Sequence, residues 1–213
     1  MQDGTKLTAR AGRPRKFDEN DALKKMQRQI WTTGLSGASL EAIARSAGLN
    51  RPSLATSFGS KDEIYAQAAV QYATMMEARI GQALDCEDLK TALTKSFDVA
   101  LDIFTSDGPN GCFVICTAPA EALTCPVCQS ILSQSLDSMD ALFLRRLERE
   151  RKTEQSEVID LPAIASQLGA TLQSLALRVR AGWTRDRLKR FVTGSVTQVI
   201  MAMGERQGSD KPV

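Results

Sequence analysis

The chain has 213 residues, of which 43% are hydrophobic, so it can bury a sizeable core and is not a disordered protein. Only 5% of the residues are aromatic and runs of Val, Ile, Thr or Tyr are few, so the composition predicts an all-helical fold. No histidine is present, which excludes Ser-His-Asp and Cys-His nucleophiles and histidine-containing zinc sites.

The net charge of +2 is distributed unevenly along the chain. Residues 1–61 contain eleven Lys or Arg and five Asp or Glu, a net charge of +6, so the remaining residues carry −4. This asymmetry favours a polyanionic partner at the N-terminal end, with a fluctuation in surface charge as the alternative. No stretch is apolar enough to cross a bilayer and the polar start lacks a signal-peptide core, so we expect a cytoplasmic protein without membrane contact.

The first predicted elements are a flexible basic arm at residues 1–16 and a helix from Asp18 to near Gly34. A short helix is predicted at 40–47, with Ser39 as its N-cap, and a second one at 50–58. Because Gly48 joins the two, the pattern is typical of a helix-turn-helix, whose second helix enters the major groove of DNA.

Six longer segments follow with helical periodicity. Ser60 and Glu63 form a capping box, which predicts a helix that continues into the low eighties. Further helices are predicted at 88–104, 112–123, 126 to about 152, 161–179 and, after a break at Gly182, through 188–203. The last two have the clearest apolar stripes, which either pair with a second copy of the chain or seal its own core.

The residues between Ser39 and Tyr65, with Gly48 between the short helices and Phe58-x-x-Lys61 after them, resemble the signature of the TetR family of bacterial transcriptional regulators. The residues Gly12-Arg-Pro-Arg-Lys16 and Trp31-x-x-Gly34 are also similar to a branch of that family, so the resemblance covers residues 12–65. Many relatives carry a tyrosine at the position of Ala55, so the resemblance implies that one usual contact with the DNA backbone is absent, with either a lower affinity or compensation by the basic arm.

The resemblance implies a homodimeric regulator, with an operator-binding domain at 17–62 after the arm and an effector-binding and dimerisation domain at 63–213, about nine helices in all. It implies that Thr56 or Ser57 and Lys61 contact phosphate, and that Arg13, Arg15 and Lys16 enter the minor groove, unless the arm is merely a solvated tail. The predicted DNA-binding residues are Arg13, Arg15, Lys16, Ser39, Asn50, Arg51, Pro52, Ser53, Thr56, Ser57 and Lys61.

The resemblance also implies an effector pocket in the helical body and a dimer formed by the last two helices. The predicted pocket residues are Met76, Ile80, Phe97, Leu101, Phe104, Phe113, Cys116 and Leu144. The expected function is that of a repressor, not an enzyme, released from double-stranded operator DNA by a small-molecule or reactive-species effector, with no cofactor. An architectural DNA binder without a ligand is an alternative.

Four cysteines, Cys112, Cys116, Cys125 and Cys128, lie within seventeen residues. They are candidate redox thiols, because a thiolate near the start of a helix has a lowered pKa and reacts with oxidants or electrophiles. Two other interpretations stay open. The cysteines can be small apolar side chains that fill the core, or they can form a zinc site with four thiolate ligands. The Cys125-Pro-Val-Cys128 spacing also allows a thiol-disulfide oxidoreductase, although the strands that usually accompany such a motif are not predicted.

Overall fold

The computed structural model describes residues 18–106, 108–150 and 159–204. These residues form nine helices and no strand, which confirms the predicted fold class. The helices are α1 (Glu19–Thr33), α2 (Leu40–Ser46), α3 (Arg51–Phe58), α4 (Lys61–Leu84), α5 (Leu89–Phe104), α6 (Phe113–Glu121), α7 (Pro126–Glu150), α8 (Leu161–Arg180) and α9 (Arg185–Gly204). The predicted end of α7 near Lys152 lies outside the described residues, and α6 ends at Glu121 instead of Leu123.

Aspartates begin three of the helices. Asp18 accepts hydrogen bonds from the backbone N–H groups of Asn20 and Asp21 at the start of α1. Asp88 and Asp160 accept one such bond each at the starts of α5 and α8. A carboxylate at this position satisfies a free N–H group and stabilises the positive end of the helix dipole, so these helix starts follow from local sequence.

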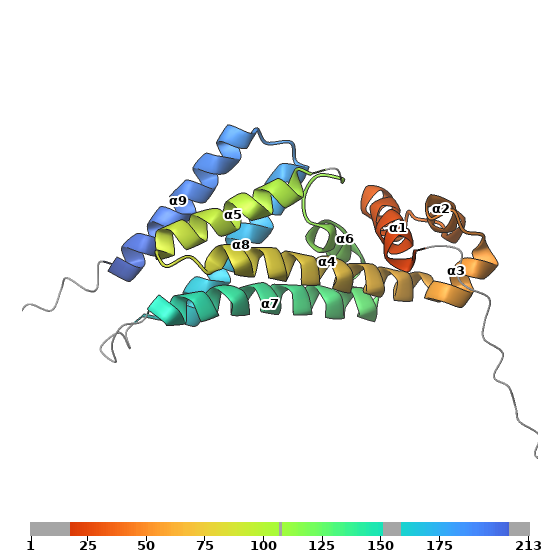
Figure 1. Ribbon diagram of the computed structural model, residues 1–213, viewed down its shortest axis with the longest axis horizontal. Coiled ribbons are helices and arrows are strands. Elements are labelled where there is room, and N and C mark those ends of the chain that lie inside the picture. Colours follow the sequence, from red (N-terminus) through yellow and green to blue (C-terminus); the bar gives the residue numbers. More distant parts are fainter. Residues whose placement is uncertain (1–17, 107, 151–158, 205–213) are drawn as a thin grey trace, which may run out of the picture.

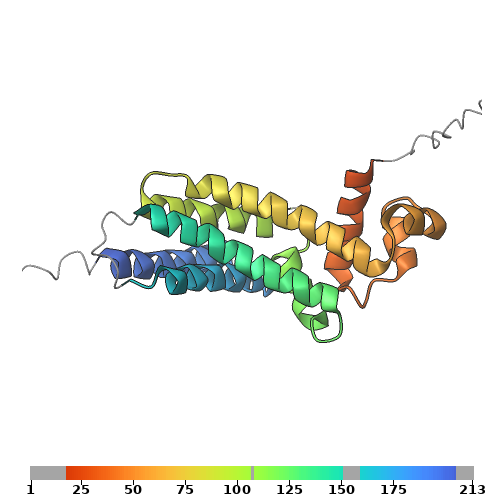
Figure 2. The ribbon, with the colours of Figure 1, turned by 90° about the horizontal axis from the view of Figure 1, so that it is seen from below.

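Helices α1 to α3 form a small unit, here called the head, at one end of the molecule (Figure 1). Helix α4 extends from the head along the larger unit of α4 to α9, here called the body (Figure 1). In the body α4 packs against α5 and α7, and α7 packs against α8. Figure 2 shows α4 and α7 side by side along the length of the body. The chain passes from the head to the body at the start of α4, so α4 is the covalent link between the two units.

An aromatic cluster joins the head to the body. The ring of Phe113, at the start of α6, lies 5.4 Å from that of Tyr65 and 6.0 Å from that of Tyr72, both on α4. The indole ring of Trp31 on α1 lies 5.7 Å from the same phenylalanine ring. All four side chains are buried, and aromatic pairs at these distances add stabilisation beyond burial of apolar area. The position of the head therefore depends on α6 as well as on α4.

The connection into α6 requires a glycine at position 111. Gly111 has a φ of 98°, a conformation that is rare for other residues, and a Cβ atom there would lie 2.8 Å from the carbonyl oxygen of Ala176 on α8. The N–H of Gly111 donates to the carbonyl of Phe104, which closes the loop between α5 and α6. This close packing fixes the start of α6 against α8.

At the far end of the body, one buried charge ties α7 to the turn between α4 and α5. The guanidinium of Arg146 donates to the carbonyl oxygens of Cys86 and Glu87 at 3.2 and 2.9 Å and pairs with Glu150 at 3.0 Å. A buried charge is tolerated only with such partners, so this contact specifies how the turn docks on α7.

Candidate nucleic-acid interface and effector cavity

The predicted helix-turn-helix is present and its geometry follows from its caps. Ser39 accepts the N–H of Ala42 at the start of α2, and Asn50 accepts the N–H of Ser53 at the start of α3. Between them Gly48 has a φ of 69°, which allows the tight reversal. Leu54 of α3 and Ile43 of α2 both lie in the apolar core and are at most 1% exposed, and the two helices are in contact. The pair of helices therefore has a fixed angle.

Opposite this apolar contact, α3 presents its polar residues to solvent. Arg51, Pro52 and Thr56 are exposed, while Ser53 and Ser57 are half-buried. The guanidinium of Arg51 pairs with Glu41 of α2 at 2.8 Å, and the hydroxyl of Thr56 donates to the carbonyl of Pro52. An exposed pair of this kind is weak, so phosphate or a base edge can compete for the arginine.

Lys61 begins α4, next to a complete capping box. The Ser60 hydroxyl accepts the N–H of Glu63, and the Glu63 carboxylate accepts the N–H of Ser60, which holds the pKa of Glu63 below its ordinary value. The ammonium of Lys61 donates to the carbonyl oxygen of Ser36 at 3.5 Å. A cation beside the start of a helix is a favourable environment for an anion.

A carboxylate from the body reaches the same place. Glu121, the last residue of α6, accepts the backbone N–H of Ser36 at 3.0 Å and its hydroxyl at 2.6 Å. These two hydrogen bonds, with the charge of Lys61 nearby, lower the pKa of Glu121. The contact joins residues 85 positions apart, and no local sequence signal indicates it. The loop after α1 is thus held to the end of α6.

A buried hydrogen bond lies at the same junction. The hydroxyl groups of Tyr65 on α4 and Thr117 on α6 are 2.9 Å apart, and Thr117 also contacts the carbonyl of Phe113 at 2.7 Å. Burial raises the pKa of Tyr65 well above its ordinary value, so the phenol stays protonated. Tyr65 therefore acts as a neutral anchor between the start of α4 and the middle of α6.

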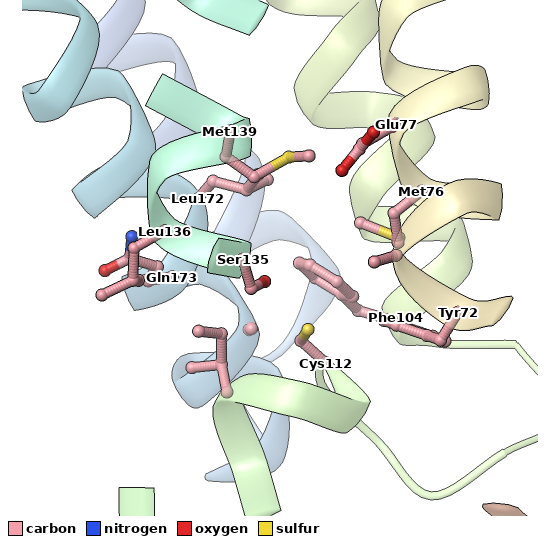
Figure 3. Close-up of a pocket in the computed structure, with 13 residues that line it drawn as sticks. Tyr72, Met76, Glu77, Phe104, Cys112, Ser135, Leu136, Met139, Leu172 and Gln173 are labelled. Atoms are coloured by element: carbon pink, nitrogen blue, oxygen red, sulfur yellow. The ribbon is translucent and has the colours of Figure 1, made fainter. Parts of the chain in front are cut away.

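The body contains a narrow apolar cavity of about 30 Å³ that opens to solvent. Figure 3 shows Met76 and Glu77 of α4 facing Ser135 and Met139 of α7 across it. Phe104, Cys112 and residues of α8 complete the lining, in which Glu77 is the single charged side chain. A second cleft, of about 170 Å³, lies between α4 and α7 and shares Ala73, Glu77 and Ser135 with the cavity, so the two are adjacent.

Two of the predicted pocket residues, Met76 and Phe104, line this cavity. Ile80, Phe97, Leu101 and Phe113 belong to the packed core and are at most 1% exposed, and the half-buried Cys116 and Leu144 do not line the cavity. Sequence periodicity identified the apolar faces correctly, but it does not distinguish a side chain that fills the core from one that borders a gap. The polar lining residues Glu77, Ser135 and Gln173 were not predicted.

All five cysteines are free thiols. Cys112 lines the cavity at the N-cap of α6, and burial raises the pKa of its thiol to about 11. Cys125 and Cys128 lie at the start of α7, where the sulfur of Cys125 accepts the N–H of Cys128 at 3.3 Å. Within the described ranges no three Cys, Asp or Glu side chains gather as metal ligands would, which gives the zinc interpretation no support.

Arg13, Arg15 and Lys16 lie outside the described residues. None of the described helices is both long and apolar enough to cross a membrane.

Comparison with known proteins identifies the helix-turn-helix. A family model described as bacterial regulatory proteins of the tetR family matches residues 25–68, from within α1 to the first part of α4. The HTH-type transcriptional repressor ComR of Escherichia coli (strain K12) is 27% identical over 190 residues, which cover 84% of this chain and 88% of ComR.

Solved structures extend the similarity to the body. A cysteine mutant of the TetR family transcriptional regulator CifR, complexed with 26-base-pair double-strand operator DNA, matches with a TM-score of 0.77 and 26% identity over 87% of this chain and 98% of that one. A transcriptional regulator from Rhodococcus sp. Rha1 shares the fold, with a TM-score of 0.69, 20% identity and coverage of 91% and 98%. These relatives are named as transcriptional regulators. The protein is a DNA-binding transcriptional regulator, with a helix-turn-helix region that matches the tetR family model and a fold similar to TetR family regulators along most of the chain.

Proposed function

We propose that the protein is a repressor that places α3 in the major groove of operator DNA. The observation that carries this proposal is the exposed polar face of α3, held at a fixed angle by Ile43 and Leu54 within the region that matches the family model. Short polar side chains and one arginine suit contacts with base edges and phosphates. ComR is named a repressor, and CifR is solved on its operator, which supports the same mode of action here.

The proposed domains are the basic arm at 1–16, the DNA-binding domain at 17–62 and the effector and dimerisation domain at 63–213. Arg13, Arg15 and Lys16 in the arm would enter the minor groove, where arginine is favoured by the strong negative potential. Ser39, Asn50, Arg51, Pro52, Ser53, Thr56, Ser57 and Lys61 are the proposed contacts on the head. A regulator of this kind would work in the cytoplasm, where bacterial DNA lies.

Selection of duplexes from a random pool tests this proposal. Arg51→Ala is the informative variant, because Asn50 also caps α3 and its loss would disturb the helix. We expect Arg51→Ala to relax sequence preference at one or two positions of each half-site, at a cost of about 1–3 kcal/mol against the preferred base. An unchanged preference would exclude Arg51 from base recognition. A wild-type protein that selects no duplex would contradict the proposed function itself.

We also propose that two chains pair through α8 and α9. Leu177 on α8 and Met201 on α9 are 51% and 55% exposed, and a Cβ atom built at Gly194 of α9 meets nothing within 4 Å, so this surface has room for another helix. Sedimentation velocity tests the pairing. Leu177→Glu with Met201→Glu should yield monomers, whereas Val70→Glu on α4, also at an exposed apolar position, should remain dimeric.

The cavity between α4, α7 and α8 is the proposed effector site. Its lining is apolar with Glu77 as the single charge, so an uncharged or cationic effector is favoured over an anionic one. Binding there would favour a dimer whose heads no longer match successive major grooves, which releases the operator. Thermal shifts with aldehydes, quinones and small aromatic acids test this preference. Stabilisation by the acids alone would contradict this preference. If no ligand changed the affinity for DNA, the architectural DNA binder would be favoured instead.

A further inference from the structure

The strongest unassigned feature is the pair of thiols at the start of α7. Cys125 occupies the N-cap position, because its carbonyl accepts the N–H of Gln129 at 3.0 Å and its sulfur accepts the N–H of Cys128 at 3.3 Å. The side chain of Cys125 is half-buried, whereas Cys128 is fully buried. The chain therefore presents one accessible thiol with a second thiol directly behind it.

The two thiols have different environments. The N–H of Cys128 and the positive end of the 25-residue helix α7 both stabilise negative charge on the sulfur of Cys125. Burial, together with the nearby sulfur of Cys125, raises the pKa of Cys128 to about 12. Cys125 is thus suited to attack an oxidant first, and Cys128 is suited to react only with an oxidised neighbour.

We propose that Cys125 and Cys128 are a redox modification site, at which a hydroperoxide closes a disulfide that weakens DNA binding. This inference rests on the proposed DNA-binding function. In the first step the Cys125 thiolate attacks the peroxide, which gives a sulfenic acid on Cys125 and releases hydroxide or alkoxide. The Cys128 sulfur then attacks the Cys125 sulfur, its proton leaves with the departing hydroxide as water, and the disulfide forms. The two thiols lose two electrons in total, and the peroxide gains them.

The site is connected to the contact that holds the head. The N–H of Cys125 donates to the carbonyl of Glu121 at 2.8 Å, and the carboxylate of Glu121 holds Ser36 in the loop after α1. In the reduced protein the Cys125 sulfur accepts the N–H of Cys128, and both residues are free thiols. Closing the bond would draw the Cys125 sulfur away from this N–H and shift the turn that precedes α7, and the hydrogen bond from the Cys125 N–H would transmit this shift to Glu121.

The other thiols lack this arrangement. Cys112 lines the cavity and is buried at the N-cap of α6, and burial raises the pKa of its thiol to about 11, which disfavours the reactive thiolate. The sulfur of Cys86 accepts a hydrogen bond from the ammonium of Lys95 at 3.3 Å, but it lies beyond the end of α4, away from the head. Cys86 is therefore a useful control, since it is a thiol in a polar environment that is remote from the proposed site.

The experiment exposes the reduced full-length protein to hydrogen peroxide and follows two readouts. Peptide mapping identifies the disulfide, and fluorescence anisotropy measures affinity for a duplex selected by the reduced wild-type protein. We expect a Cys125–Cys128 disulfide and an affinity lower by about tenfold, within the usual range of allosteric coupling, both reversed by a dithiol reductant. Cys86→Ser should behave like the wild type, whereas Cys125→Ser and Cys128→Ala should bind DNA equally well with and without peroxide.

Glu121→Gln tests how the effect reaches the head. In this variant the disulfide should still form, but the loss of affinity on oxidation should be smaller than in the wild type. The proposal is overturned if peroxide leaves this pair reduced, if the disulfide forms without a change in affinity, or if Cys128→Ala still responds. A reduced wild-type protein that selects no duplex would instead contradict the proposed function.

Discussion

The head and the body of this protein use their side chains in different ways. In the head, Asp18, Ser39 and Asn50 cap helices, and the polar face of α3 is left in solvent. In the body, most side chains fill a large apolar core, and the cavity is a gap in that packing. Local sequence rules therefore specify the head, whereas the functional part of the body depends on which core positions are incompletely packed.

The largest predicted effect is a loss of stability caused by a substitution in the core of the body. Phe97 is fully buried and its ring stacks on that of Phe143 with 5.8 Å between centroids. Phe97→Ala should lower the free energy of unfolding by about 3–5 kcal/mol, because it removes apolar contacts and leaves a cavity. Urea unfolding followed by circular dichroism measures this. A loss below about 1 kcal/mol would show that this part of the core is loosely packed.

A smaller effect is expected at the junction of head and body. Tyr65→Phe removes the hydrogen bond to Thr117 and should cost about 1 kcal/mol of unfolding free energy. Tyr72→Phe is the comparison, because the buried Tyr72 hydroxyl makes no hydrogen bond of good geometry and has only the Cys112 thiol and the backbone of Phe113 as neighbours, so its removal should cost less. The same urea titration compares the two. Equal losses would contradict the anchoring role of Tyr65.

At the head surface, Lys61→Ala should weaken binding to all duplexes and lower the salt dependence of log K by about one unit of slope, as expected for one lost phosphate contact. Lys95→Ala on α5, which removes an ammonium remote from the head, should leave the slope unchanged. A titration with salt measures both variants. An unchanged slope for Lys61→Ala would mean that the Lys61 ammonium interacts with Ser36 and Glu121 but does not contact phosphate.

The smallest effect concerns pH. The pKa of Glu121 is lowered in the folded protein, first by the hydroxyl of Ser36, so its contribution to stability is present above the ordinary pKa of 4.5 and is lost as pH falls through the folded pKa. Urea midpoints of wild type and Glu121→Gln should therefore differ near neutral pH and converge in acid. A constant difference across this range would exclude the ionised carboxylate as the cause.

Sequence reasoning predicted the helices well because their ends depend on near neighbours. The capping box of Ser60 and Glu63 and the reversal at Gly48 are local signals. The start of α6 at Phe113 was predicted to within one residue, and the close approach of Gly111 to Ala176 of α8 positions it. The end of α6 was placed two residues too late, at Leu123, which is 98% exposed.

The functional contacts of the body were predicted less well. Glu121 meets Ser36 across 85 positions, so the pairing depends on tertiary structure and leaves no periodic signal. Phe97 and Phe104 have the same sequence pattern on α5, yet only Phe104 borders the cavity. The spacing of Cys125 and Cys128 was visible in the sequence, but the hydrogen bond on the Cys125 sulfur and the burial of Cys128 were not.

Footprinting tests most directly whether the α3 helices of two symmetrically paired chains bind the major groove of one DNA duplex. A selected duplex bound by the purified protein should be protected from hydroxyl radicals in patches on one face of the helix, centred about one turn or 34 Å apart. Two results would contradict recognition by a symmetric pair. One is protection of a single patch by a monomer, and the other is uniform protection that a heparin-like polyanion removes equally for every DNA sequence.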